Sequence, residues 1–136
     1  MMRLTFKKEK MSNEFYKHHV KGLPFSAVIH HFIAPDTGGP HDHPFGFTTH
    51  ILHGSYVERV YTIHDGTVTV QDVLREQGTS HYVPAETIHE IIGLPDGDCF
   101  TLITPGPWER ETHFWKFENG LILNRHWRKR KYRIVK

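Results

Sequence analysis

The sequence predicts an all-β fold of antiparallel strands with little helix. Three observations carry this prediction. Short β-rich segments recur along the chain, turn-forming dipeptides separate several of them, and prolines interrupt the middle of the sequence. No window of 11 or more residues shows a helical stripe of apolar residues, so helix is expected only as a short segment around residues 12–19.

Three pairs of strands are predicted to form hairpins, because Asp-Gly and Asn-Gly accept the positive φ angles of tight turns. They are residues 56–64 and 67–73 around Asp65-Gly66, residues 90–92 and 100–103 around Asp96-Gly97, and residues 114–117 and 121–123 around Asn119-Gly120. Further strands are predicted at residues 26–33, 47–52 and 81–83. Many short strands at regular spacing indicate a sandwich or a barrel, and closure into a barrel would remove exposed edges.

The chain is the size of one domain, at 136 residues and 16.0 kDa. We expect an N-terminal arm and edge strand over residues 1–24, a barrel over residues 25–123, and a basic strand or tail over residues 124–136 packed on the same domain. An apolar content of 38%, with 9 Phe, 5 Tyr and 3 Trp, argues against a disordered chain.

The sequence gives no sign of a membrane span or a secretory leader. No stretch approaches the roughly 20 apolar residues that cross a bilayer, and the first ten residues alternate charged with apolar side chains. The single cysteine, Cys99, cannot form an internal disulfide, which agrees with a reducing compartment. We therefore expect a cytoplasmic protein that does not contact membranes.

Histidine is unusually frequent, with 13 in 136 residues, and this enrichment points to metal or proton chemistry. His41 and His43 are two residues apart, so in an extended segment both imidazoles project from the same face. Such a pair can offer two ligands to one ion. By itself it is weak evidence, because surface placement of two histidines explains the pattern equally well.

The spacing of residues around this pair resembles the two conserved motifs of the cupin superfamily. The first motif corresponds to His41, His43, Phe47 and Gly54, and the second to Gly78, Pro84, His89 and Gly93. The segment Pro-His-Asp-His-Pro-Phe also resembles the corresponding segment of small single-domain cupins of bacteria and phages, to which no reaction is assigned. The resemblance implies a single antiparallel barrel of the jelly-roll (double-stranded β-helix) type, with a divalent metal ion on His41, His43 and His89.

Three positions depart from the superfamily pattern. Phe47 stands where the first motif usually has a metal-binding glutamate, Glu86 where the second has a glycine, and Gly93 where it has an asparagine. The resemblance therefore implies a three-histidine site, similar to that of cupin dioxygenases acting on thiols or diketones. Three neutral imidazoles leave the charge of the ion uncompensated, so its open positions favour an anionic or chelating ligand. Iron, zinc, nickel and manganese all remain open.

Other side chains are candidates for supporting roles. Glu58, Glu86 and Arg75 are candidates for hydrogen bonding to the metal ligands, and a glutamate as a fourth ligand is less favoured. Candidate pocket-lining residues are Phe47, Tyr56, His81, Phe100 and Trp115, for which core packing is the alternative interpretation.

These features predict a metal-binding protein that acts on, or only binds, a small anionic or chelating molecule. Oxygen-dependent (dioxygenase-like) chemistry is the first reaction to test, with isomerase, lyase and hydrolase activities open and a non-catalytic binding module as the alternative. The basic tail, with seven of the 17 Lys and Arg residues, raises nucleic-acid binding as a further alternative. It is unfavoured, because the basic residues do not sort to one face of a strand. The resemblance also implies a homodimer.

Overall fold

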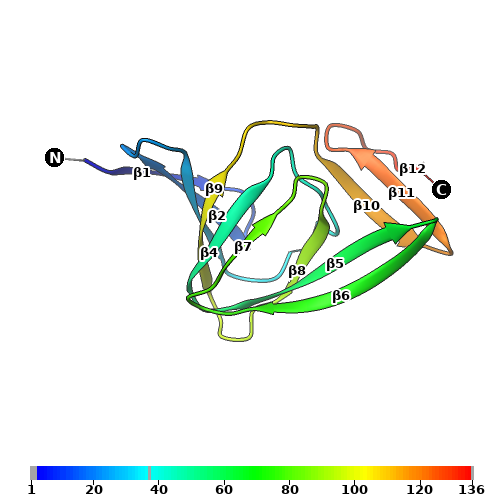
Figure 1. Cartoon of the computed structure of the whole chain (residues 1–136), viewed down its shortest axis with the longest axis horizontal. Helices are drawn as coiled ribbons and strands as arrows, with labels where there is room; N and C mark the ends of the chain where they lie inside the picture. Colours follow the sequence, from blue (N-terminus) through cyan, green and yellow to red (C-terminus); the bar gives the residue numbers. More distant parts are fainter. Residues whose placement is uncertain (1–2, 37, 136) are drawn as a thin grey trace.

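A computed structural model describes residues 3–36 and 38–135, and within them the chain forms strands and no helix (Figure 1). The strands are β1 (Thr5–Lys10), β2 (Phe15–Lys21), β3 (Ala27–Phe32), β4 (Phe47–His53), β5 (Tyr56–His64), β6 (Thr67–Arg75), β7 (Ser80–Val83), β8 (Ile88–Gly93), β9 (Cys99–Pro105), β10 (His113–Glu118), β11 (Leu121–His126) and β12 (Arg133–Ile134). The all-β prediction is confirmed. In these described ranges no helix is long and apolar enough to cross a membrane.

The short helix predicted around residues 12–19 is wrong, since most of that segment lies in β2. β2 pairs along its length with β1 on one side and with β3 on the other, antiparallel in both cases. Pairing with two neighbouring strands satisfies the backbone of β2 and stabilises its extended form.

Two antiparallel sheets make up the fold. One has the strand order β1-β2-β3-β9-β4-β7. The other is built from the units β6-β5-β8 and β10-β11-β12, which are joined through the single residue His41, because His41 forms antiparallel bridges to both His89 and Phe114. Among the described residues no strand pairing joins the edges of the two sheets. The fold is thus a pair of facing sheets, and the closure into one continuous barrel that we predicted is not observed.

Two of the three predicted hairpins are present. Asp65 and Gly66 have φ angles of 51° and 75°, and Asn119 and Gly120 have φ angles of 52° and 72°, as a type I′ turn requires. The third prediction, at Asp96-Gly97, is wrong, because β8 pairs with β5 whereas β9 pairs with β3 and β4. The turn dipeptide there reverses the chain between the two sheets.

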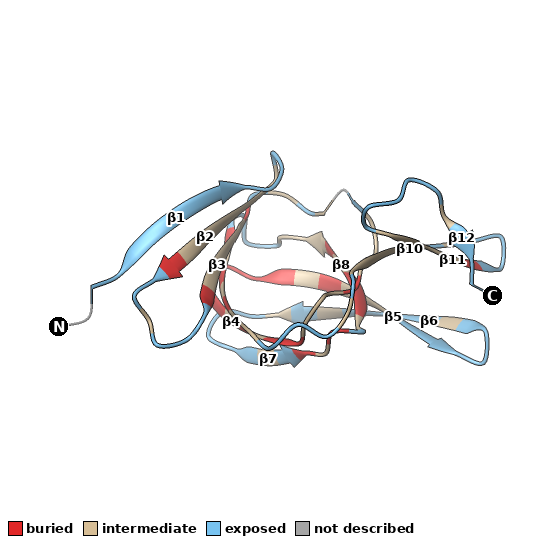
Figure 2. Cartoon of the chain, turned by 90° about the horizontal axis from the view of Figure 1, so that it is seen from above, coloured by how far each residue is buried: buried red, intermediate tan, exposed pale blue. Residues whose placement is uncertain are grey.

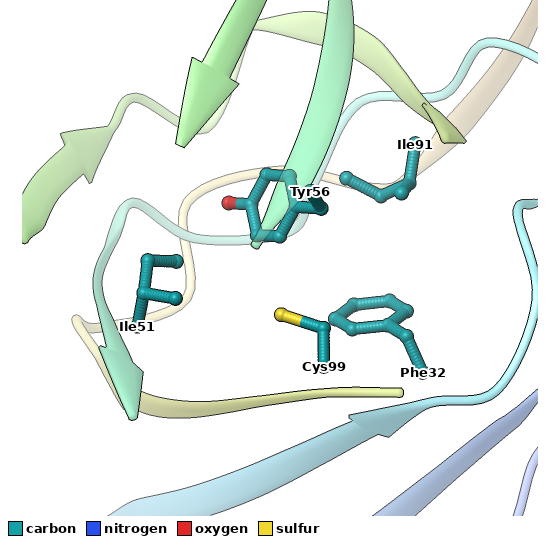
Figure 3. Close-up of a cluster of buried hydrophobic side chains, with 5 residues drawn as sticks. All are labelled: Phe32, Ile51, Tyr56, Ile91 and Cys99. Atoms are coloured by element: carbon teal, nitrogen blue, oxygen red, sulfur yellow. The ribbon is translucent and has the colours of Figure 1, made fainter. Parts of the chain in front are cut away.

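The faces of the two sheets that meet carry the core. β4 and β9 alternate strictly, so that Phe47, Thr49 and Ile51 and their counterparts Cys99, Thr101 and Ile103 are buried while the residues between them are more exposed (Figure 2). Across the gap, Tyr56 of β5 and Ile91 of β8 pack with Phe32, Ile51 and Cys99 in one cluster (Figure 3). Each buried large apolar side chain contributes roughly 1.5–3 kcal/mol.

The connection from β4 to β5 requires a glycine at position 54. Gly54 has a φ angle of 75°, and a Cβ atom there would lie 2.6 Å from the carbonyl oxygen of Asp98. Any other side chain would force apart the turn that carries the chain from one sheet to the other. This glycine is the last residue of the first motif recognised in the sequence.

The chain ends differ in how they attach to the two sheets. β1 is exposed along its whole length at the edge of the larger sheet. At the other end, β12 pairs with β11 through Leu123 with Ile134 and Asn124 with Arg133, so the basic tail folds back onto the domain.

Candidate metal centre

The segment between β3 and β4 that carries His41 and His43 is held by backbone hydrogen bonds to three other parts of the chain. The N–H of His41 donates to the carbonyl of His89 and the N–H of His89 to the carbonyl of His41, both at 3.0 Å. The N–H of Asp42 donates to the carbonyl of His113 at 3.0 Å, and that of His43 to the carbonyl of Ala85 at 2.9 Å. This network fixes the extended conformation that aims both imidazoles the same way.

Asp42, between the two histidines, is the side-chain anchor of the segment. Its carboxylate is 1% exposed and accepts hydrogen bonds from the N–H of His113 at 2.7 Å and from Nε1 of Trp115 at 3.0 Å. Arg110 pairs with the same carboxylate at 3.2 Å. Because both carboxylate oxygens of Asp42 have partners on residues 110–115, they are directed away from the imidazoles beside it.

The imidazoles of His41, His43 and His89 converge. One ring nitrogen of each lies within 4.8 Å of those of the other two. The ring centroids are 5.2 Å apart for His41 with His43, 5.2 Å for His41 with His89, and 4.7 Å for His43 with His89. The ring planes are inclined to one another by 69–80°. Three imidazoles arranged in this way point toward one common position rather than stack.

Hydrogen bonds to the far nitrogen of two rings define which nitrogen faces that position. Nδ1–H of His41 donates to the carbonyl of Gly39 at 3.0 Å, and Nδ1–H of His89 donates to Oε2 of Glu58 at 3.0 Å. In both rings the lone pair is therefore on Nε2. Such outer partners fix the tautomer and orientation of metal-binding histidines in proteins.

The third ring, His43, has one nitrogen close to His89 and the other without a hydrogen-bond partner among the described residues. Its Nε2 lies 3.1 Å from Nε2 of His89, while its buried Nδ1 has no hydrogen-bond partner among the described residues. Since Nε2 of His89 carries a lone pair, a proton on Nε2 of His43 must bridge the two nitrogens when no cation is bound. A cation in that position would take both lone pairs and move the proton to Nδ1.

The distances fit a metal ion. Two imidazoles bound to one ion at about 2.1 Å, with an angle of 90–110° between them, have nitrogens about 3.0–3.4 Å apart. The observed separation of 3.1 Å between His43 and His89 lies in this interval. The residues present are therefore suited to hold a divalent ion with open positions for further ligands.

The electrostatic environment keeps two of the three rings, His41 and His43, in the form that a metal needs. Burial lowers the pKa of His43 to about 2, with the charges of His89 and His41 adding to the effect. Burial, followed by the charge of His89, likewise lowers the pKa of His41. Metal ligands must be deprotonated, so both imidazoles are ready to bind at neutral pH.

Glu58 is buried, at 2% exposure, and is held as a carboxylate beside these rings. Burial alone would raise its pKa, but hydrogen bonds from His89 and Arg75 and their charges lower it to about 2. Arg75 reaches Oε1 of Glu58 with Nη2 at 2.8 Å. Glu58 and Arg75, both predicted as supporting residues, thus lie in one chain of contacts that ends on His89.

Three predicted pocket residues lie on the inner faces of the sheets. The ring of Phe47 meets that of His43 at 4.9 Å with an interplanar angle of 72°, in the position where the cupin pattern has a carboxylate ligand. Tyr56 is buried, and its hydroxyl lies 3.2 Å from Nε2 of His81. Figure 3 shows this hydroxyl directed away from Ile91, toward the side on which Ile51 lies. Burial lowers the pKa of His81, so this imidazole is neutral at neutral pH.

The other predicted residues lie elsewhere. Phe100 falls between the inward-facing Cys99 and Thr101, so it lies on the outer face of the sheet, where it stacks on His31 at 4.1 Å. Trp115 is tied to Asp42, on the side opposite the imidazoles. Glu86 is exposed in the turn before β8. The sequence did not reveal the role of Asp42, because its partners, on residues 110–115, are about 70 positions away.

The comparisons with known proteins bear on the fold. No family model matches this sequence, and no curated protein matches it. Solved structures are similar to it. Hydroxypropylphosphonic acid epoxidase from S. wedmorenis superimposes with a TM-score of 0.58 at 10% identity, over 78% of this chain and 59% of that one. An iron(II) form of this epoxidase (HppE) superimposes with a TM-score of 0.54 at 13% identity, over 76% of this chain and 57% of that one.

A second kind of enzyme shares the fold. Oxalate oxidase in complex with the substrate analogue glycolate superimposes with a TM-score of 0.53 at 14% identity, over 65% of this chain and 45% of that one. The chain thus spans less than two thirds of each of these enzymes, which are cupin-fold proteins. At such low identities the likeness shows the fold alone: two antiparallel sheets of the cupin type.

Proposed function

We propose that the chain is a metal-binding cupin protein in which His41, His43 and His89 hold one divalent ion, and that the ion binds a small anionic or chelating molecule. The observation that carries the proposal is the convergence of three imidazole nitrogens, two with their tautomers fixed by outer hydrogen bonds. The similarity of fold to an iron(II) enzyme and to an oxidase supports it.

The preference for an anion follows from the charges around the site. Three neutral imidazoles add nothing to the charge of a divalent ion. The negative charge of Glu58 is offset by that of Arg75, which lies 2.8 Å from it. The centre therefore keeps a net charge of about +2, and in a partly desolvated site this favours a carboxylate, a phosphonate or an enolate over a neutral ligand.

The residues of the chain contribute orientation and exclusion of water. Phe47 places an apolar ring against His43, where a carboxylate would otherwise compete with an incoming ligand for the ion. Glu58 and the carbonyl of Gly39 hold the rings of His89 and His41. Iron bound there would supply oxygen-dependent chemistry to a ligand held in its open positions. The proposed activity is therefore that of a non-haem, dioxygenase-like oxidoreductase.

The proposal is tested with protein purified without an affinity tag. Metal analysis should find one divalent ion per chain, and His89→Ala should lose it while His64→Ala, a change at an exposed histidine in a hairpin, should retain it. Oxygen consumption by the iron-loaded protein with thiols, β-diketones and phenolic acids would then establish oxidation. Stoichiometric metal without oxygen consumption would indicate a ligand-binding module. A folded His89→Ala protein that still binds one metal ion per chain would overturn the site.

A further inference from the structure

We infer that Lys17, His30 and Thr101, side by side on the inner face of the larger sheet, bind a second anionic group of a ligand whose first anionic group is held at the three-histidine centre. This inference rests on the proposed function and adds to it a substrate class: small molecules with two acidic groups and an apolar body between them.

The strand register places the three side chains in one row. Lys17 of β2 pairs with His30 of β3, and His30 pairs with Thr101 of β9. Directly paired residues of antiparallel strands project to the same face. Thr101 also pairs with Ile51, which lies in the buried core cluster, so this face is the one that looks toward the opposite sheet.

Two members of the row, Thr101 and Lys17, carry hydrogen-bond donors without a partner among the described residues. The hydroxyl of Thr101 is buried in a residue with 0% exposure and has no partner among the described residues. The ammonium of Lys17 has no hydrogen-bond partner within that same part of the chain. Buried donors are normally satisfied, so the unsatisfied hydroxyl of Thr101, in one row with the ammonium of Lys17, indicates a place for acceptor atoms that the chain itself does not supply.

The nearest acidic side chain offsets the charge of the row only in part. Glu9 pairs with Lys17 across β1 and β2, but its carboxylate binds Nε2 of His19 at 2.8 Å and is half exposed. Burial lowers the pKa of Lys17, and burial together with the charge of Lys17 lowers the pKa of His30 to about 3. The row therefore combines one desolvated cation with a neutral imidazole and a hydroxyl, a set of donors for an anion.

An apolar surface lies beside the row. Phe15 and Phe32 stack with centroids 4.8 Å apart and planes 9° apart, and the ring of His30 meets Phe15 edge-on at 4.9 Å. These rings suit a hydrocarbon or aromatic body. The same face also carries Phe47 of β4, whose ring meets that of His43 at 4.9 Å, so the row shares its face with a side chain that contacts the metal centre.

A cavity adjoins the next row along the same face. A cavity of about 520 Å³ is lined by His19 and Val28, which pair with each other two residues from Lys17 and His30. Its other walls include the connection between β2 and β3 and Pro105. The cavity thus lies one row beyond Lys17 and His30, at the end of the sheet away from Phe32.

The test uses the full chain loaded with cobalt(II), whose visible spectrum reports ligands that bind the ion. Straight-chain dicarboxylates from malonate to suberate are titrated, each against the monocarboxylate of equal length. At least one dicarboxylate should bind tenfold or more tightly than its monocarboxylate. Lys17→Met should remove that advantage and leave monocarboxylate affinity unchanged, whereas Lys17→Arg should retain it. Thr101→Val should reduce it three- to tenfold.

Lys10→Met is the matched control, because it removes one positive charge from an exposed position of β1. It should leave the dicarboxylate advantage within twofold. No advantage for any dicarboxylate, or an advantage that survives Lys17→Met, would overturn the inference while leaving the metal centre standing. Failure of cobalt to bind one per chain would instead overturn the proposed function, and this inference with it.

Discussion

Replacing Glu58 with glutamine should weaken metal binding without unfolding the protein. The change keeps the size of the buried side chain but removes the charge that accepts a hydrogen bond from Nδ1 of His89 at 3.0 Å. Adding the width of the imidazole ring and a metal–nitrogen bond of about 2.1 Å puts the carboxylate about 7 Å from a bound ion. At an effective dielectric constant of about 20, one negative charge attracts a divalent cation over this distance by about 5 kcal/mol.

That figure is an upper bound on the loss. The amide oxygen of glutamine can still accept the hydrogen bond from His89, and the charge of Arg75, 2.8 Å from Glu58, already offsets part of the attraction. Removal of outer partners of metal-binding histidines usually costs 10- to 100-fold in affinity, which is about 1.4–2.8 kcal/mol. We therefore expect Glu58→Gln to raise the dissociation constant for zinc by 10- to 100-fold.

The assay is competition with a chromophoric chelator at neutral pH, together with circular dichroism to show that the variant is folded. Asp72→Asn is the control, since it removes a carboxylate that pairs with Arg59 at the exposed surface of β6. It should change zinc affinity less than twofold. A folded Glu58→Gln protein with wild-type zinc affinity would refute the role of Glu58 in orienting His89.

Three further predictions concern pH and the anchor of the histidine segment. Because the pKa values of His41 and His43 are lowered, zinc affinity should fall much less from pH 7 to pH 5.5 than the several hundredfold expected of three unperturbed histidines. Chelator competition across this range measures the fall, and a several-hundredfold loss would contradict the burial effect. The pKa of His30 is depressed to about 3, so the unfolded chain binds more protons between pH 6.5 and 3, and stability of the metal-free protein should fall as pH drops through that window. His30→Asn should flatten this slope in denaturant titrations, and an unchanged slope would count against it. Asp42→Asn removes the buried charge that pairs with Arg110. It should lower the free energy of unfolding by about 2–3 kcal/mol and weaken metal binding. Unchanged stability and unchanged metal affinity would show that Asp42 does not position the segment.

The sequence was most informative where local chemistry determines structure. The dipeptides Asp65-Gly66 and Asn119-Gly120 form the predicted turns because both residues of each accept positive φ angles. Alternation in β4 and β9 correctly located strands, since one face of each is buried. The spacing of His41 and His43 likewise placed two imidazoles on one side of an extended segment.

What the sequence could not supply are contacts between distant segments. Asp96-Gly97 has the composition of a hairpin turn, but the partners of β8 and β9 are chosen by packing of two sheets, which no local pattern records. Phe100 appeared to be a pocket residue because aromatic residues favour the core, whereas its neighbours Cys99 and Thr101 occupy the inner face. β2 was mistaken for helix because its stabilising neighbours, β1 and β3, are not visible in its own residues.

The central claim is that one metal ion is bound by three imidazoles from two distant segments. A crystal of the zinc-loaded protein, measured on both sides of the zinc absorption edge, tests it most directly. The account predicts one strong anomalous peak per chain, about 2.0–2.1 Å from Nε2 of each of His41, His43 and His89. A peak bound by other residues, or no peak among these three rings, would contradict it.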